Sequence, residues 1–325
     1  MKKFLILCLI GLQLAQAAEP LRIFIRSGAK THGPGCHDYP AFLSDWTKLL
    51  NKRGAKATGG DDFPTAEQLA ETDVVILHAS EAGNIKGKER ENFEAYLKRG
   101  GGVVAIHGAT VSRDADWYKA VIGGSWEFGK TKYLEGHMSL YFTDRENPIT
   151  RGASNFDLED EIYYDMQMMP EAKILAAAYT PKPKDGSSGR RKPVNIYDIQ
   201  PQIWTYETGK HRAFAFVPGH VYANFSHISV QTILLRGIAW AGKSEDVDAL
   251  LADSEKAESD LLYPVGGPTR PEEAAAKIEM HPDFKLSLVA AEPLINKAMN
   301  IDWDEKGRMW VVETPEYPNG LRKAN

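Results

Sequence analysis

Cysteine is nearly absent from this chain. Its 325 residues include two cysteines, Cys8 and Cys36. Cys8 lies within an apolar amino-terminal stretch that we expect to be removed, which leaves one thiol in the mature protein. A single thiol excludes an internal disulfide, a cysteine-rich zinc ribbon and a CxxCH haem site within these residues.

Long hydrophobic runs are missing as well. The apolar run from Phe4 to Leu14 is shorter than the roughly 20 residues that cross a bilayer, and no later segment is long and uncharged enough. Lys2 and Lys3 precede this run, and Ala15-Gln16-Ala17 follows it as an A-x-A cleavage site. We therefore predict that residues 1–17 are a removed signal peptide. The protein is expected to be exported, periplasmic or extracellular, with no membrane anchor.

The sequence also has no excess of positive charge. It contains 39 Lys and Arg against 44 Asp and Glu, a formal net charge of −5. Removal of the signal peptide takes away two lysines and makes the charge more negative. A negative protein is repelled by a phosphate backbone, so nucleic acid is not an expected partner.

The apolar residues that are present gather in short runs. A helical pattern over Tyr39–Arg53 separates the first two runs, and another over Lys86–Arg99 separates the second and third. Alternating strands and helices predict right-handed parallel crossovers, and near-continuous apolar strands are typical of a sheet covered on both faces. The fold class is therefore α/β, a doubly wound, mostly parallel sheet of the flavodoxin type. The four predicted strands are Leu21–Ile25, Val74–Leu77, Val103–Ile106 and Ala213–Val217.

The later part of the chain is more mixed. Residues 204–206 and 212–217 are expected to pair as strands across a turn at Gly209, before a final helix at about 227–240. We expect the α/β domain to occupy residues 18–242 and an acidic linker helix to follow at 243–263. From residue 264 to 325 the composition predicts short strands, a β-rich segment too small to bury its own faces.

Polar side chains gather where the predicted strands end. In open α/β sheets, ligands bind beyond the carboxyl ends of the strands. His37 follows the first strand, Glu81 the second, His107 the third and His220 the fourth. If these ends share one rim, imidazoles and carboxylates meet there, with His137 and Glu161 as additions from the intervening segment. Such groups are suited to proton transfer or metal binding.

Several motifs follow one another in the order of a known family. They are Gly35-Cys36-His37-Asp38-Tyr39-Pro40, Gly101 to Thr110 with Ala105-Ile106-His107-Gly108, Gly123-Gly124-Ser125-Trp126, Asp160-Glu161-Ile162-Tyr163 and Pro218-Gly219-His220. This succession resembles the trehalose-utilisation (ThuA-like) family over residues 21–242. The resemblance implies a fold similar to class I glutamine amidotransferases and a role in carbohydrate metabolism.

One departure from the amidotransferases bears on mechanism. In those enzymes the turn after the third strand holds a nucleophilic cysteine, whereas this sequence has His107-Gly108 there. This chain therefore lacks the nucleophile of cysteine-dependent amidotransferases at that turn, unless Cys36 in another loop replaces it. We therefore do not expect a Cys-dependent glutamine amidotransferase.

Residues 264–325 resemble the opening of a β-propeller from sugar-dehydrogenase-like proteins, which are commonly fused to ThuA-like domains. A propeller needs several blades around an axis, so this stretch is expected to be its incomplete start. The resemblance implies that the remaining propeller or haem-binding domains lie outside the sequence given.

The residues and the resemblance together favour a carbohydrate-active protein, a hydrolase or isomerase acting on a sugar or keto-sugar. The alternative is a non-catalytic sugar-binding or docking module for the fused propeller. Two mechanisms stay open: acid–base catalysis, or a divalent metal such as zinc bound by His37, His107 and His137. The sequence contains no compact metal motif such as H-E-x-x-H. The expected catalytic residues are His37, His107, Glu81 and Glu161, and the expected substrate-binding residues are Trp126, His220 and Tyr163.

Overall fold

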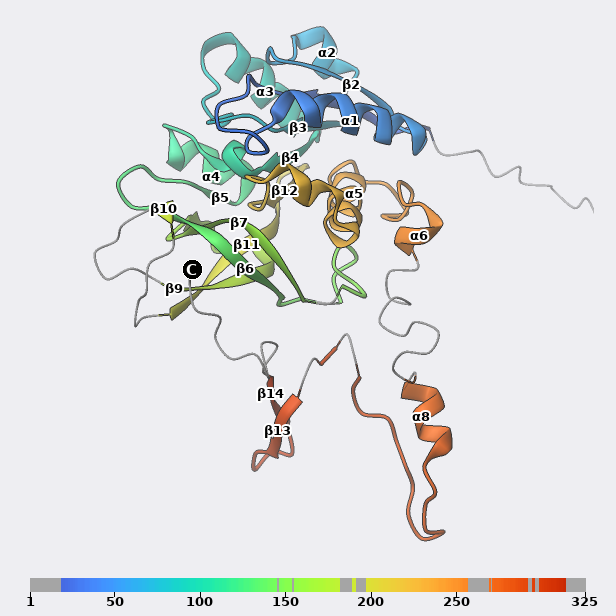
Figure 1. Cartoon of the computed structure of the whole chain (residues 1–325). Helices are drawn as coiled ribbons and strands as arrows, with labels where there is room; N and C mark the ends of the chain where they lie inside the picture. Colours follow the sequence, from blue (N-terminus) through green and yellow to red (C-terminus); the bar gives the residue numbers. More distant parts are fainter. Residues whose placement is uncertain are drawn as a thin grey trace, which may run out of the picture.

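A computed structural model describes most of the chain (Figure 1). The described residues are 19–144, 146–153, 155–181, 189–190, 197–256, 269, 271–291, 294–295 and 298–313, and the side chains of 179–181, 189–190 and 197–198 are not described. The predicted signal peptide at 1–17 lies outside them. Within these ranges no helix is both long and apolar enough to cross a membrane.

One half of the molecule is a parallel sheet with helices on both faces. Its strand order is β2-β1-β3-β4-β12, and every neighbouring pair in that order is parallel. This confirms the α/β class. The strands are β1 (Arg22–Arg26), β2 (Lys56–Gly60), β3 (Val74–Leu77), β4 (Gly102–Ile106) and β12 (His211–Phe216).

The helices that connect these strands divide between the two faces. The side chains of α1 and α5 pack together in one apolar cluster, and those of α2, α3 and α4 pack in a second cluster on the opposite face. This two-sided cover is the doubly wound arrangement that the sequence predicts. The helices are α1 (Tyr39–Lys52), α2 (Ala66–Ala70), α3 (Gly87–Arg99), α4 (Ala115–Ile122) and α5 (Ile228–Ala241).

The other half of the sheet is antiparallel. Beyond β12 the order continues β11-β9-β6, β7 pairs with β6, and the short β10 lies parallel to β6 at the edge. The turn expected at Gly209 joins β11 to β12 as predicted. These strands are β6 (Lys132–Phe142), β7 (Phe156–Tyr164), β9 (Lys173–Pro181), β10 (Gly189–Arg190) and β11 (Tyr197–Thr208). A separate small sheet pairs β5 (Gly124–Ser125) with β8 (Gln167–Met168).

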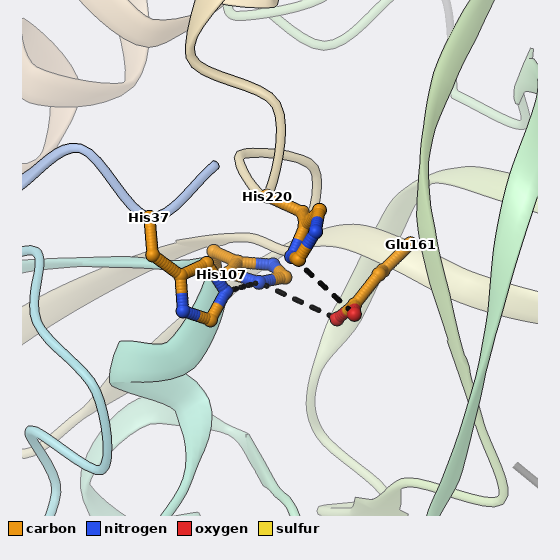
Figure 2. A group of neighbouring side chains, drawn as sticks. All are labelled: His37, His107, Glu161 and His220. Atoms are coloured by element: carbon orange, nitrogen blue, oxygen red, sulfur yellow. Dashed lines mark hydrogen bonds and ion pairs between the residues drawn. The ribbon is translucent and has the colours of Figure 1, made fainter. Parts of the chain in front are cut away.

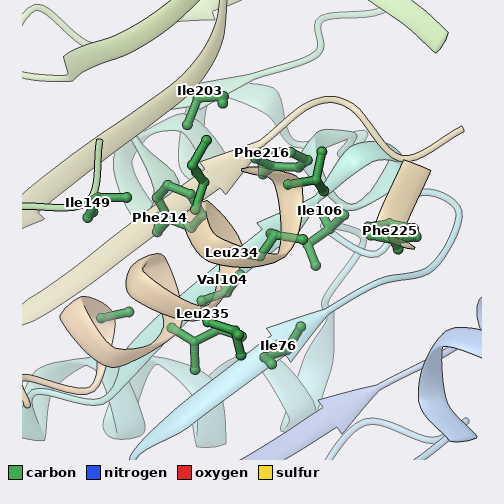
Figure 3. Packing of buried hydrophobic residues seen from close by; sticks show 14 of the residues in the cluster. Ile76, Val104, Ile106, Ile149, Ile203, Phe214, Phe216, Phe225, Leu234 and Leu235 are labelled. Carbon is green, nitrogen blue, oxygen red and sulfur yellow. The ribbon is translucent and has the colours of Figure 1, made fainter. Parts of the chain in front are cut away.

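One apolar cluster of the core extends from the parallel half into the antiparallel half, and Figure 3 shows part of it. Phe214 and Phe216 of β12 pack in one cluster with Leu234 and Leu235 of α5, and all four are fully buried. Each such side chain stabilises the fold by roughly 1.5–3 kcal/mol relative to exposure. The strands that carry the candidate residues are therefore rigid supports.

Ion pairs between arginine and acidic side chains hold the segment after α5 against the domain. Asp248 accepts hydrogen bonds from Arg236 and Arg151, and the buried Glu255 accepts one from Arg53 at 2.7 Å. The described part of the predicted linker helix at 243–263 contains only the short helix α6 (Asp253–Lys256), because a turn that includes Asp248 occupies residues 247–250. Residues 257–263 lie outside the described residues.

The C-terminal segment contains the helix α8 (Pro271–Lys277) and one antiparallel hairpin of β13 (Ala298–Trp303) and β14 (Met309–Glu313). Its apolar side chains are exposed: Phe284 is 69 % and Trp303 61 % accessible. The hairpin confirms the short strands expected near the end of the sequence, whereas residues 281–291 contain no strand. The start of a propeller remains a prediction.

Candidate functional site

The candidate site lies where the carboxyl ends of β4 and β12 meet the loop after β1 and the strand β7. Four side chains come together there, and none comes from the same element as another (Figure 2). One nitrogen or oxygen from each lies within 4.8 Å of the others. The four are His37, His107, Glu161 and His220.

His107 occupies the turn directly after β4. Its backbone has φ 52°, a left-handed conformation that is uncommon for a residue with a side chain. The strained turn points the imidazole into the centre, where it is fully buried. Its Nδ1 donates to the carbonyl of Val217 at 2.8 Å, since a carbonyl only accepts. In the neutral ring Nε2 therefore carries the free lone pair.

His37 comes from the loop after β1 and is also left-handed, with φ 45°. Its Nε2 lies 2.8 Å from Nε2 of His107, and its Nδ1 lies 3.0 Å from the hydroxyl of Thr31. The backbone N–H of His37 donates to the carbonyl of His220 at 2.9 Å. The loops that carry His37 and His220 are thus joined by their backbones.

His220 follows β12 in the sequence Pro218-Gly219-His220, and Asp160 holds this turn in place. The carboxylate of Asp160, buried in β7, accepts hydrogen bonds from the backbone N–H groups of Gly219 and His220 and from the Asn224 amide. Gly219 has φ 145°, and a Cβ on it would lie 3.2 Å from Cβ of His107. Glycine is therefore required for the close approach of the two histidines.

Glu161 completes the group from the adjacent position in β7. Its Oε2 lies 3.5 Å from Nε2 of His107, and its Oε1 lies 3.3 Å from Nδ1 of His220. Nδ1 of His220 is buried and has no hydrogen-bond partner. The carboxylate therefore faces two imidazoles without a well-formed hydrogen bond to His220.

Burial dominates the electrostatics of this centre. Desolvation, followed by repulsion from neighbouring imidazoles, lowers the pKa of His37 to about 3. Desolvation and the nearby Asp160 raise the pKa of Glu161 to about 8. Burial also lowers the pKa values of His107 and His220, the two histidines that face Glu161. An ion pair would move these pKa values and that of Glu161 the other way, so the short His–Glu distances do not describe a salt bridge. All members of the group prefer their neutral forms when no cation is bound.

An aromatic wall borders the centre. The Tyr163 hydroxyl lies 3.3 Å from Nε2 of His107, and the Trp126 ring meets that of Tyr163 edge-on at a centroid distance of 5.0 Å. Trp126 also lies 6.5 Å from the ring of Tyr133. Trp126 and Tyr133 are partly exposed, so flat apolar surface lies between the buried polar group and solvent.

Two residues expected at the site lie outside the group of four. Glu81, with φ 48°, pairs with Arg113 and accepts a hydrogen bond from Asn84 at the turn after β3. His137 lies further along β6, 3.4 Å from Glu159, on the face that Glu161 shares. Conversely, His220, which was expected to bind substrate, lies beside His37 and His107 in the group that could hold a metal ion.

Sequence reasoning missed the residues that position the group. Asp160 holds the His220 turn, Thr31 contacts His37, and the carbonyl of Val217 orients His107. The sequence does contain a signal for Asp160, which is adjacent to Glu161. In a strand, adjacent side chains point to opposite faces, so both carboxylates can be buried against different partners. The backbone carbonyl of Val217 gives no sequence signal.

The fold and the site define an α/β protein with a buried polar centre at the carboxyl edge of a doubly wound sheet. Residues 30–241 match the ThuA family, described as trehalose utilisation, and the chain belongs to this family. Residues 270–325 match a domain of unknown function, DUF7133. No curated protein sequence matches the chain.

Solved structures agree on the fold. A putative ThuA-like protein from Bacteroides uniformis is 21 % identical, with a TM-score of 0.54 over 74 % of this chain and 100 % of that one. Another from Parabacteroides merdae is 17 % identical, with a TM-score of 0.50 over 70 % of this chain and 91 % of that one. At these identities the likeness concerns the fold alone.

Proposed function

We propose that this protein is a carbohydrate-active enzyme, a hydrolase or isomerase that acts on a sugar or keto-sugar at the centre formed by His37, His107, Glu161 and His220. Family membership supports a carbohydrate-related role. The observation that carries the enzymatic assignment is the convergence of four buried, ionisable side chains from four separate segments. Packing alone does not favour such an arrangement, because each buried polar group costs free energy.

The aromatic wall supports a sugar as the substrate. Trp126 and Tyr133 offer partly exposed rings beside Tyr163, whose hydroxyl reaches His107. A pyranose whose apolar face lies on such rings directs its hydroxyl or carbonyl groups toward the imidazoles. We further propose that the chain is exported and that its C-terminal segment begins a fused sugar-dehydrogenase-like propeller.

The proposal is tested with the full chain on a panel of trehalose, other glucosides and their keto-sugar counterparts, with products followed by chromatography and NMR. His107→Ala and His37→Ala are expected to lower kcat/KM at least about 100-fold, the usual contribution of a positioned acid or base. His211→Gln serves as the matched control, because His211 lies at the opposite end of β12 and bonds the carbonyl of Val121. Unchanged turnover in both alanine variants would reject the site.

A non-catalytic sugar-binding module is the second candidate. It is favoured by the elbow after β4, which carries His107 where an amidotransferase carries its nucleophile. Saturable sugar binding, measured by calorimetry, with no product from any member of the panel would support this candidate. Formation of product would exclude it.

A further inference from the structure

We infer that His37, His107, His220 and Glu161 bind one divalent first-row transition-metal ion, with zinc as the first candidate. This inference names the cofactor of the site described above. It rests on the proposed function only for the part that the ion plays in catalysis. The binding itself follows from the positions of the four side chains.

The distances between donor atoms suit a single ion. Zinc binds imidazole nitrogen and carboxylate oxygen at about 2.0–2.2 Å, so ligand atoms around a tetrahedral ion lie about 3.3–3.6 Å apart. Nε2 of His107 lies 3.5 Å from Glu161 Oε2, and Nδ1 of His220 lies 3.3 Å from Glu161 Oε1. The two Nε2 atoms of His37 and His107, at 2.8 Å, need to separate by about 0.5–0.8 Å to reach this range.

Groups around the ligands hold them in the orientation that metal binding needs. The Val217 carbonyl takes the Nδ1 proton of His107, which leaves the Nε2 lone pair directed at the centre. The Thr31 hydroxyl can take the Nδ1 proton of His37 in the same way. Outer hydrogen bonds of this kind accompany nearly all histidine ligands and fix their tautomers. Asp160 holds the backbone of His220.

One buried polar atom is unsatisfied without an ion, and one contact between histidines depends on the tautomer. Nδ1 of His220 has no hydrogen-bond partner although the residue is only 5 % exposed. Nε2 of His37 and Nε2 of His107 lie 2.8 Å apart and form a hydrogen bond only when one of them carries a proton, whereas with the proton of each ring on Nδ1 both direct lone pairs at the centre. A cation at the centre would accept all three lone pairs. It would also balance the buried carboxylate of Glu161.

The donor set selects the class of metal. Three imidazoles and one carboxylate suit zinc and its neighbours, whereas Mg²⁺ and Ca²⁺ prefer oxygen ligands. Such an ion would polarise a sugar carbonyl or activate water, which are the steps that a hydrolase or isomerase requires. His137 lies beside Glu159 and Asp157, apart from the group, and is not one of the proposed ligands.

The test measures metal content and affinity without any substrate. The full chain is stripped with EDTA and titrated with Zn²⁺ against a chromogenic chelator, and bound metal is counted by mass spectrometry. One equivalent is expected for the wild type, with no competition from millimolar Mg²⁺. Cobalt substitution is expected to give a visible absorption band typical of low coordination with nitrogen ligands.

Variants identify the ligands. His220→Gln and Glu161→Gln should each weaken Zn²⁺ binding by more than about 100-fold, since loss of a ligand exceeds the 10- to 100-fold cost of losing an outer hydrogen bond. The matched control His137→Gln should bind as the wild type does. Loss of metal in His137→Gln with retention in His220→Gln would overturn the assignment, as would a folded wild type that binds no Zn²⁺, Mn²⁺ or Co²⁺.

Metal binding and sugar turnover are measured independently, so failure of the metal site can be told from failure of the proposed function. If a variant fails to fold by circular dichroism, the wild-type stoichiometry and the cobalt spectrum still decide. Sugar turnover by a metal-free protein would reject the catalytic role of the ion and keep the enzyme. One equivalent of metal with no turnover would keep the ion and reject the catalytic proposal.

Discussion

At the scale of single residues, the site depends on strained backbone. His37, Glu81 and His107 all have positive φ, and they lie in the loop between β1 and α1, in the turn after β3 and directly after β4. Residues other than glycine adopt this conformation at a cost of about 1–3 kcal/mol, and it persists where the surrounding contacts determine it. Two of the three aim an imidazole into the centre.

This strain predicts an unusual order of stability at position 107. His107→Gly and His107→Ala both remove the imidazole and leave a similar cavity, but only glycine adopts φ 52° without penalty. The glycine variant should therefore be more stable than the alanine variant by about 1–2 kcal/mol in urea unfolding. Equal stabilities would mean that the turn relaxes in solution.

His78 predicts how stability responds to acid. It is completely buried against Tyr39, Phe42 and Phe225, and desolvation lowers its pKa to about 3. Because the unfolded chain protonates near pH 6.5, this contribution is fully present above that pH and is lost as the pH falls toward 3. The free energy of unfolding should drop by about 1.4 kcal/mol per pH unit in this window for this group alone.

The contribution of His78 can be isolated with His78→Phe, which keeps an aromatic ring in an aromatic cluster and removes the titration. Urea unfolding of this variant and of the wild type is compared at pH 8 and pH 5. We expect the variant to lose less stability on acidification. Identical losses would show that other buried histidines account for the whole effect.

At the scale of elements, β7, which pairs with β6 in the antiparallel half, supplies two carboxylates to the site at the end of the parallel strands. Glu161 presents its carboxylate to the histidines, while Asp160 next to it binds the Gly219–His220 turn from the other face of the strand. Burial raises the pKa of Asp160 to about 6, and hydrogen bonds from three backbone N–H groups and from the Asn224 side chain oppose that rise. One strand thus supplies a functional group and the support for another.

Replacement of Asp160 should loosen the turn without unfolding the protein. Asp160→Asn removes the charge that accepts the N–H groups of Gly219 and His220, at a cost of about 1–3 kcal/mol. We expect faster amide hydrogen exchange at these two residues and little change elsewhere in β12. Asp157→Asn, on the same strand but exposed, is the control. Unchanged exchange in the Asp160 variant would contradict this role.

At the scale of the whole molecule, the described core ends before the C-terminal segment. The apolar clusters include residues up to Leu251, whereas Val289, Trp303 and other apolar side chains of the segment are largely exposed. The ThuA match likewise ends at residue 241 and the second match begins at 270. We infer that the stability of the α/β domain does not depend on the C-terminal segment.

A chain that ends at Lys256 should therefore unfold within about 1 kcal/mol of the full chain, a shift of about 2–4 °C in Tm. It should also bind less of the hydrophobic dye ANS, because the exposed apolar residues are removed. Both are measured on the purified proteins side by side. A much lower Tm would show that the C-terminal segment contributes to the core.

The predictable part of the fold was the part with the clearest pattern. Short apolar runs located β1, β3, β4 and β12, and helical spacing located α1 and α3 to within one residue. The strands β6, β7 and β9 were not located, although Leu134, Met138 and Leu140 alternate with polar residues as in a half-buried strand. Their pairing depends on contacts that are distant in sequence.

By itself, the sequence determined the fold class and the places where reactive side chains follow strands. It did so because burial periodicity and strand ends are local properties of a chain. Only the tertiary structure decided which candidates meet: His220 joins His37 and His107, while His137 and Glu81 lie apart. That choice follows from strand order, from two left-handed turns and from the register of β6 with β7, which depend on packing across the whole molecule.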